Sequence, residues 1–107
     1  MIRVVYRSEH YSVSIEGHAN SAEPGKDLVC AGVSALAYTL AGNVWTLEET
    51  GKVWDVYVKL DSGKAEISCR PVRKYEAIVK CILRSVCIGF EMLAKQYPQY
   101  ISYEIRG

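Results

Sequence analysis

The sequence of 107 residues contains little of what marks a metal site, a disulfide framework or a nucleic-acid-binding surface. Only two histidines are present, and the four cysteines form no C-x-x-C pair and no regular framework. Both observations argue against zinc binding and against a disulfide-stabilised fold. The net charge of +1 gives no basic footprint for nucleic acid. We therefore expect no metal and no direct contact with nucleic acid.

Signals for export or membrane insertion are also missing. The segment Met1–Arg7 has no apolar run of the length found in secretory signals. No later stretch approaches the apolar length that spans a bilayer. Because free thiols persist in a reducing compartment, we expect a cytoplasmic protein with free cysteines and no membrane partner.

Half of the residues are apolar, which is enough for one core, so a single domain over residues 1–107 is expected. Apolar residues at helical spacing predict two long helices, from Asp27 to Gly51 and from Tyr75 to Tyr97-Pro98. Two-residue alternation predicts five strands, over residues 2–7, 11–16, 54–61, 65–69 and 101–105. The order ββαββαβ predicts an α+β two-layer sandwich, a mainly antiparallel sheet with both helices on one face.

Three of the cysteines have an ordinary structural interpretation. Cys69, Cys81 and Cys87 are predicted to fill the core, because cysteine is among the most buried residue types. On the second helix, Cys81, Ile88 and Met92 also form an additional apolar stripe that one sheet would not fully cover. Such a stripe predicts a symmetric dimer.

The fourth cysteine lies where chemistry is expected. Cys30 falls in the first turn of the first predicted helix, where unpaired N–H groups and the helix dipole favour a thiolate. His18 follows a predicted strand on its polar side, and the polar segment 20–26 between the two is expected to be a mobile loop. Asp27 lies within one turn of Cys30, and Ser34 lies on the same helix face. A nucleophile, a base and oxyanion donors could therefore meet here.

Each of these residues also has an ordinary alternative. A lone cysteine on a helix is usually a core residue, and a lone histidine at a strand end is usually a solvated surface group. Asp27 is an N-cap candidate, and Ser34 could be no more than a surface hydroxyl. The residues alone leave both interpretations open.

The combination of motifs resembles the ribosomal-processing cysteine protease family, Prp. The residues that carry the resemblance are Gly17-His18-Ala19 and, after a short loop, the run Gly25–Leu36, which contains G-x-D-x-V-C-A-x-V-S. The resemblance implies that His18 and Cys30 form the catalytic pair. It also implies that Gly17, Asp27 and Ser34 are supporting or substrate-binding residues.

The resemblance further implies an activity. Prp enzymes are cysteine endopeptidases that remove a short N-terminal extension from a large-subunit ribosomal protein, cutting after an aromatic residue. They act as homodimers, and a thiolate mechanism with an acyl-enzyme intermediate needs no cofactor. The alternative hypothesis is a non-catalytic dimeric module that binds to the ribosome.

Overall fold

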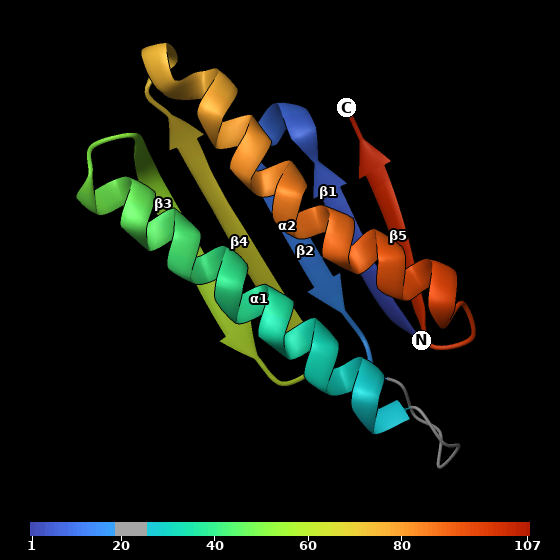
Figure 1. The fold of residues 1–107 in the computed structure, drawn as a ribbon. Helices are drawn as coiled ribbons and strands as arrows, with labels where there is room; N and C mark the ends of the chain where they lie inside the picture. Colours follow the sequence, from blue (N-terminus) through green and yellow to red (C-terminus); the bar gives the residue numbers. More distant parts are fainter. Residues whose placement is uncertain (19–25) are drawn as a thin grey trace.

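The computed structural model describes residues 1–18 and 26–107, which form one five-stranded sheet and two long helices (Figure 1). The sheet has the strand order β3-β4-β2-β1-β5. Strand β5 runs parallel to β1, and the other neighbouring strands are antiparallel. The predicted α+β sandwich is confirmed. Its elements are β1 (Ile2–Arg7), β2 (Ser12–Glu16), α1 (Lys26–Glu49), β3 (Val53–Asp61), β4 (Lys64–Pro71), α2 (Glu76–Gln96) and β5 (Ile101–Arg106), with 3-10 turns at Ser8–His10 and Arg73–Tyr75.

The first hairpin follows the alternation of its sequence. Ile2, Val4 and Tyr6 are buried on one face of β1, and the intervening side chains are not. Tyr11, however, adopts the left-handed conformation (φ 50°) at the end of the 3-10 turn. Strand β2 therefore begins at Ser12, one residue after the predicted start.

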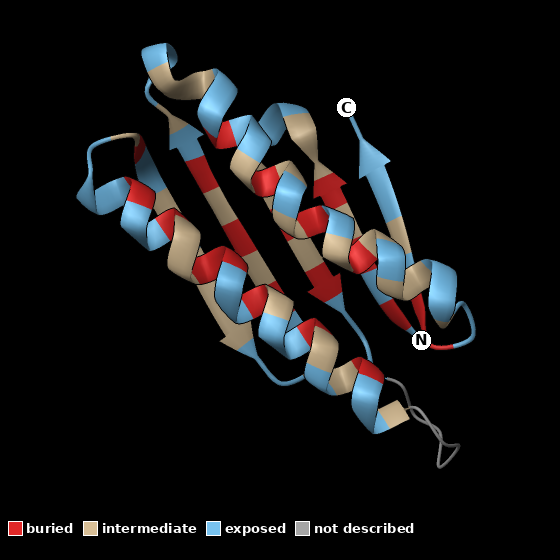
Figure 2. Cartoon of the chain, in the orientation of Figure 1, coloured by how far each residue is buried: buried red, intermediate tan, exposed pale blue. Residues whose placement is uncertain are grey.

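Both helices cover the same face of the sheet (Figures 1 and 2). Helix α1 contacts β3 and β4, whereas α2 contacts β5. The buried residues of each helix recur at intervals of three and four, so one side of each helix faces the sheet. Leu40 on α1 and Phe90 on α2 are among the largest fully buried side chains of the shared core.

Strand β3 departs from its predicted alternation. A bulge between Trp54 and Tyr57 breaks its register with β4, and Asp55 has a φ of 51°. A bulge changes the face on which the following side chains point. The inward position therefore changes from Val53 before the bulge to Val56 and Leu60 after it, and Trp54 is 54% exposed, with Arg70 from β4 against its ring.

The structure separates the three cysteines that were assigned to the core. Cys69 and Cys87 are buried, but Cys81 is exposed, so its assignment as a core residue was wrong. Cys81 lies on the outer side of α2, where Ile88 and Met92 are 44% and 57% exposed. The predicted apolar stripe on α2 is therefore present on the surface.

The statement that no stretch has the apolar length of a membrane span also needs correction. Helix α1 has 24 residues and contains a window of mean hydropathy 1.4. By length and composition alone, it is long and apolar enough to cross a membrane. The reason is that residues 28–47 include no charged side chain. Core helices of soluble proteins meet the same criterion, and α1 packs on the sheet through Val29, Val33, Leu40 and Val44.

Candidate active site

The end of strand β2 places His18. The N–H of Gly17 donates to the carbonyl of Gly63 (2.9 Å), and the backbone nitrogen of Met1 donates to the carbonyl of His18 (2.7 Å). Gly17 has a φ of +103°, and a Cβ there would overlap the carbonyl oxygen of Met1. Only glycine fits both constraints. The turn of the backbone at Gly17 also ends the alternation of β2. The face on which the His18 ring lies therefore no longer follows from the alternation of the strand.

Helix α1 places Cys30, which is half-buried. It is the fifth residue of the helix, two positions later than an N-cap at Asp27 predicts, because α1 already begins at Lys26. The unpaired N–H groups of such a helix belong to residues 26, 27 and 28 rather than to Cys30 itself. Since Cα–Cβ bonds tilt toward the helix N-terminus, the Cβ of Cys30 leans toward that end of the helix.

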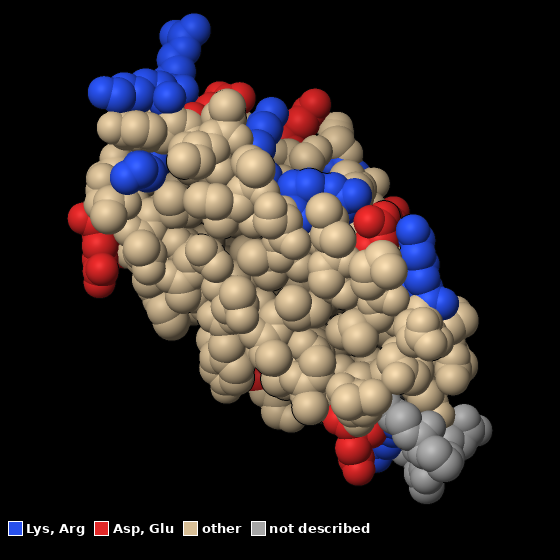
Figure 3. All heavy atoms as spheres, viewed as in Figure 1, with Lys and Arg blue, Asp and Glu red and all other residues tan. Residues whose placement is uncertain are grey.

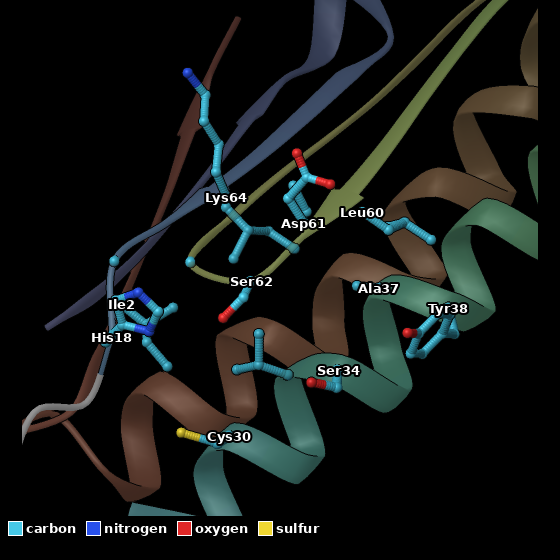
Figure 4. A pocket seen from close by; sticks show the side chains of 15 residues that line it. Ile2, His18, Cys30, Ser34, Ala37, Tyr38, Leu60, Asp61, Ser62 and Lys64 are labelled. Atoms are coloured by element: carbon cyan, nitrogen blue, oxygen red, sulfur yellow. The ribbon is translucent and has the colours of Figure 1, made fainter.

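His18 and Cys30 line the same pocket, which has a volume of about 480 Å³ (Figure 4). In Figure 4, Cys30, Ser34 and Tyr38 follow one another along α1, and His18 faces them from the end of β2. No hydrogen bond joins His18 to Cys30 in the part of the chain that the structure describes. The pocket combines a polar rim with an apolar floor, and the floor comprises Ile2, Ile15, Val33, Ala37, Leu60 and Ala65.

The remaining predicted site residues differ in position. Gly17 and Ser34 line the pocket, and Ser34 is exposed one turn after Cys30. Asp27 is exposed in the first turn of α1 and lies outside the described pocket lining. It is the second residue of the helix, so the N-cap assignment was wrong. Its negative charge still interacts favourably with the positive end of the helix dipole. The predicted mobile loop lies outside the described residues over 19–25, and Lys26 already belongs to α1.

The turn between β3 and β4 was not predicted to belong to the site. Asp61, Ser62, Gly63 and Lys64 all line the pocket, and Figure 4 shows the hydroxyl of Ser62 pointing toward α1. The sequence identifies Asp61-Ser62-Gly63 as a turn but does not say which strand end lies beside it. That information comes from the β2–β4 register, which pairs Glu16 with Lys64.

Two other thiols lie in the core, away from the pocket. Burial raises the pKa of the Cys69 and Cys87 thiols to about 11, so both stay protonated at neutral pH. Within residues 1–18 and 26–107, no three His, Cys, Asp or Glu side chains are grouped so that they could hold a metal ion. The pocket combines a half-buried thiol with an imidazole, which is a pair suited to acyl transfer.

Comparison with known proteins agrees with this chemistry. The family model described as cysteine protease Prp matches residues 1–102. The ribosomal processing cysteine protease Prp of Mycoplasma pneumoniae is 30% identical over 95 residues, which cover 89% of this chain and 87% of that protein.

Solved structures share the fold. The crystal structure of SMU.848 from Streptococcus mutans superimposes with a TM-score of 0.71 at 27% identity, covering 98% of this chain and 91% of the other. The essential ribosomal processing protease Prp of S. aureus, solved in complex with a substrate peptide, gives a TM-score of 0.69 at 20% identity, covering 98% and 97%. The match of the family model over residues 1–102 shows that this chain belongs to the Prp family of cysteine proteases.

Proposed function

We propose that this chain is a cytoplasmic cysteine endopeptidase that removes the short N-terminal extension of a large-subunit ribosomal protein. The observation that carries the proposal is the single pocket shared by His18 and Cys30. Membership of the Prp family supplies the substrate class, and the four free cysteines agree with a reducing compartment.

The proposed reaction is acyl transfer through the thiol of Cys30. His18 accepts the thiol proton, and the thiolate attacks the scissile carbonyl carbon to form a tetrahedral oxyanion. The C–N bond then breaks as the imidazolium of His18 protonates the leaving amine. His18 next takes a proton from water, which attacks the thioester and releases the acid and free Cys30. Approach of His18 to Cys30 on substrate binding is part of this proposal, because catalytic hydrogen bonds often tighten only in the complex.

The helix start is the proposed oxyanion site. The N–H groups of residues 26, 27 and 28 have no partner within α1, and the Cβ of Cys30 leans toward that end of the helix. Donors to a developing negative charge are typically worth about 3 kcal/mol each. Asp27 has two possible roles here: it orients His18 when substrate is bound, or it only stabilises the helix start.

The floor of the pocket supports a preference for an aromatic side chain before the cut. The six floor residues are aliphatic, and Tyr38 lies further along α1 (Figure 4). Burial of an aromatic ring on such a surface gives more binding free energy than burial of a small side chain. Ser34 and Ser62 line the pocket, and in this proposal they contact the peptide backbone.

The proposal is tested with the ribosomal protein of the organism from which the chain comes. After incubation with this protein, intact-mass spectrometry should find a single cut that removes only the N-terminal extension. Stable binding without any cut would favour the non-catalytic ribosome-binding module instead. Cuts at many exposed sites would contradict the proposed specificity.

We also propose that the chain is a homodimer. The outer side of α2 carries Ile78, Cys81, Ile88 and Met92 at intervals of three, seven and four, and all four are exposed. Figure 3 shows that the centre of the helix-bearing face is almost free of charged groups, which gather near its rim. An apolar helix face of this kind is unfavourable on a monomer, and a second copy would cover it symmetrically.

The dimer is tested by Ile88→Lys, which places a charge in the apolar contact at a cost of several kcal/mol. Sedimentation velocity should show a shift from dimer toward monomer at micromolar concentration. The matched control is Ile105→Lys, because Ile105 is similarly exposed (47%) but lies on β5. A wild-type protein that stays monomeric at high micromolar concentration would contradict the proposal.

A further inference from the structure

The turn between β3 and β4 meets the end of β2 through the continued ladder of the sheet. The register pairs Glu16 with Lys64, and the next ladder bond runs from the N–H of Gly17 to the carbonyl of Gly63 (2.9 Å). His18 is the residue that follows, so its side chain reaches the turn directly (Figure 4).

Gly63 lies against the ring of His18. A Cβ built on Gly63 would overlap Nε2 of the imidazole, and it would lie 2.6 Å from Cε1 and 3.2 Å from Cδ2. The ring thus occupies the space that any other residue at position 63 would need for its side chain. Gly63 also has a φ of +77°, which fits its position in the turn.

We propose that Gly63 is a positioning residue for His18. Its bare Cα is the surface against which the imidazole rests, and this contact sets the orientation of the ring toward Cys30. The inference rests on the proposed function, because it assumes that His18 exchanges protons with Cys30. Since the ladder bond to Gly17 holds the Gly63 backbone in place, an added Cβ must displace the ring rather than the turn.

The chain offers a matched control at Gly51. Gly51 has a φ of +71°, close to that of Gly63, but a Cβ there meets nothing within 4 Å. Gly51→Ala and Gly63→Ala therefore impose similar backbone strain, and only Gly63→Ala displaces a histidine. Gly63→Asn is the second test variant, because asparagine tolerates a positive φ better than alanine and still adds a Cβ.

A displacement of the His18 ring is detected by NMR of the histidine side chains. The chain has only two histidines, so His18→Ala assigns both imidazole signals. His10 lies in the turn between β1 and β2 and serves as an internal reference. In Gly63→Ala and Gly63→Asn the His18 signals should shift and the His10 signals should not. In Gly51→Ala both sets should stay in place.

Function is measured by cleavage and by the pH profile of Cys30 alkylation. In the Gly63 variants kcat should fall by about 100-fold, the size of effect that a misplaced catalytic group produces, and KM should change much less. The pH profile of Cys30 alkylation by iodoacetamide should approach that of His18→Ala. Gly51→Ala should retain the wild-type kcat and the wild-type profile.

The outcomes separate this inference from the proposed function. If His18→Ala retains full activity, the proposed reaction through the Cys30–His18 pair fails whatever Gly63 does. If His18→Ala is inactive but folded Gly63→Ala keeps the wild-type kcat, pH profile and His18 signals, the positioning role is overturned. An equal loss of activity in Gly51→Ala would also overturn it, because backbone strain would then explain both losses.

Discussion

The packed core and the pocket of this molecule hold cysteine thiols in different environments. Cys69 and Cys87 lie in the packed layer between helices and sheet, and burial raises the pKa of both thiols to about 11. Cys30 is half-buried at the start of α1, where it lines a pocket together with an imidazole. The same functional group is thus kept protonated in one region and lies beside an imidazole in a pocket in the other. Packing, not residue type, determines which thiol can react.

Removal of the Cys30 thiol should have the largest effect of the changes considered, because it should abolish almost all cleavage. Cys30→Ala should lower the cleavage rate by at least about 10³-fold, because no other thiol in the described chain lines the pocket. The fold should survive, since a half-buried thiol contributes little packing. Cleavage assays with a thermal melt check both points. Cys81→Ala, which removes an exposed thiol outside the pocket, is the control and should keep wild-type activity.

The rates of alkylation should differ by less than the cleavage rates, but they compare the core thiols with the pocket thiol directly. At pH 8 a thiol with a pKa of about 11 is ionised in only about one molecule in a thousand, so Cys69 and Cys87 should resist iodoacetamide. Cys30 should react first, ahead of exposed Cys81, and His18→Ala should slow its reaction near neutral pH. Peptide mapping after a brief exposure measures the order. Preferential labelling of Cys81 would count against the assignment of Cys30 as the nucleophile.

The buried thiols should produce the smallest effect, a loss of stability at alkaline pH. Their pKa is raised from 9.0 in the reference state to about 11, so the unfolded chain releases these protons first as the pH rises. The contribution is complete below pH 9 and is lost between about pH 9 and 11, by about 2 kcal/mol per thiol. Urea titrations across this range should show the fall. The slope should decrease in Cys69→Ala, whereas an unchanged slope would contradict a burial-raised pKa.

The parts of the fold that depend on local pattern could be predicted from the sequence. Alternation in residues 2–7 identified β1, and helical spacing with Gly51 identified the extent of α1 to within two residues at its end. The departure of β3 from its predicted alternation has a physical reason, because a bulge leaves no mark in a two-residue pattern. The error at Cys81 arose because apolar composition does not say which side of a helix faces the sheet.

The part of the site that depends on local motifs could also be predicted from the sequence. His18 and Cys30 carry motif and position signals in the sequence, and the structure places both on one pocket. The contribution of Ser62 and Gly63 could not be found, because it depends on the pairing of β2 with β4. Strand pairing is a long-range property, whereas motifs and periodicity are local ones.

Trapping the acyl-enzyme intermediate shows directly whether Cys30 carries the acyl group during turnover. An acid quench during cleavage of the ribosomal protein, followed by peptide mapping, should find the N-terminal extension attached as a thioester to the peptide that contains Cys30. The adduct mass should equal that of the extension less one water. Attachment at another residue, or cleavage by Cys30→Ala at the wild-type rate, would contradict the account.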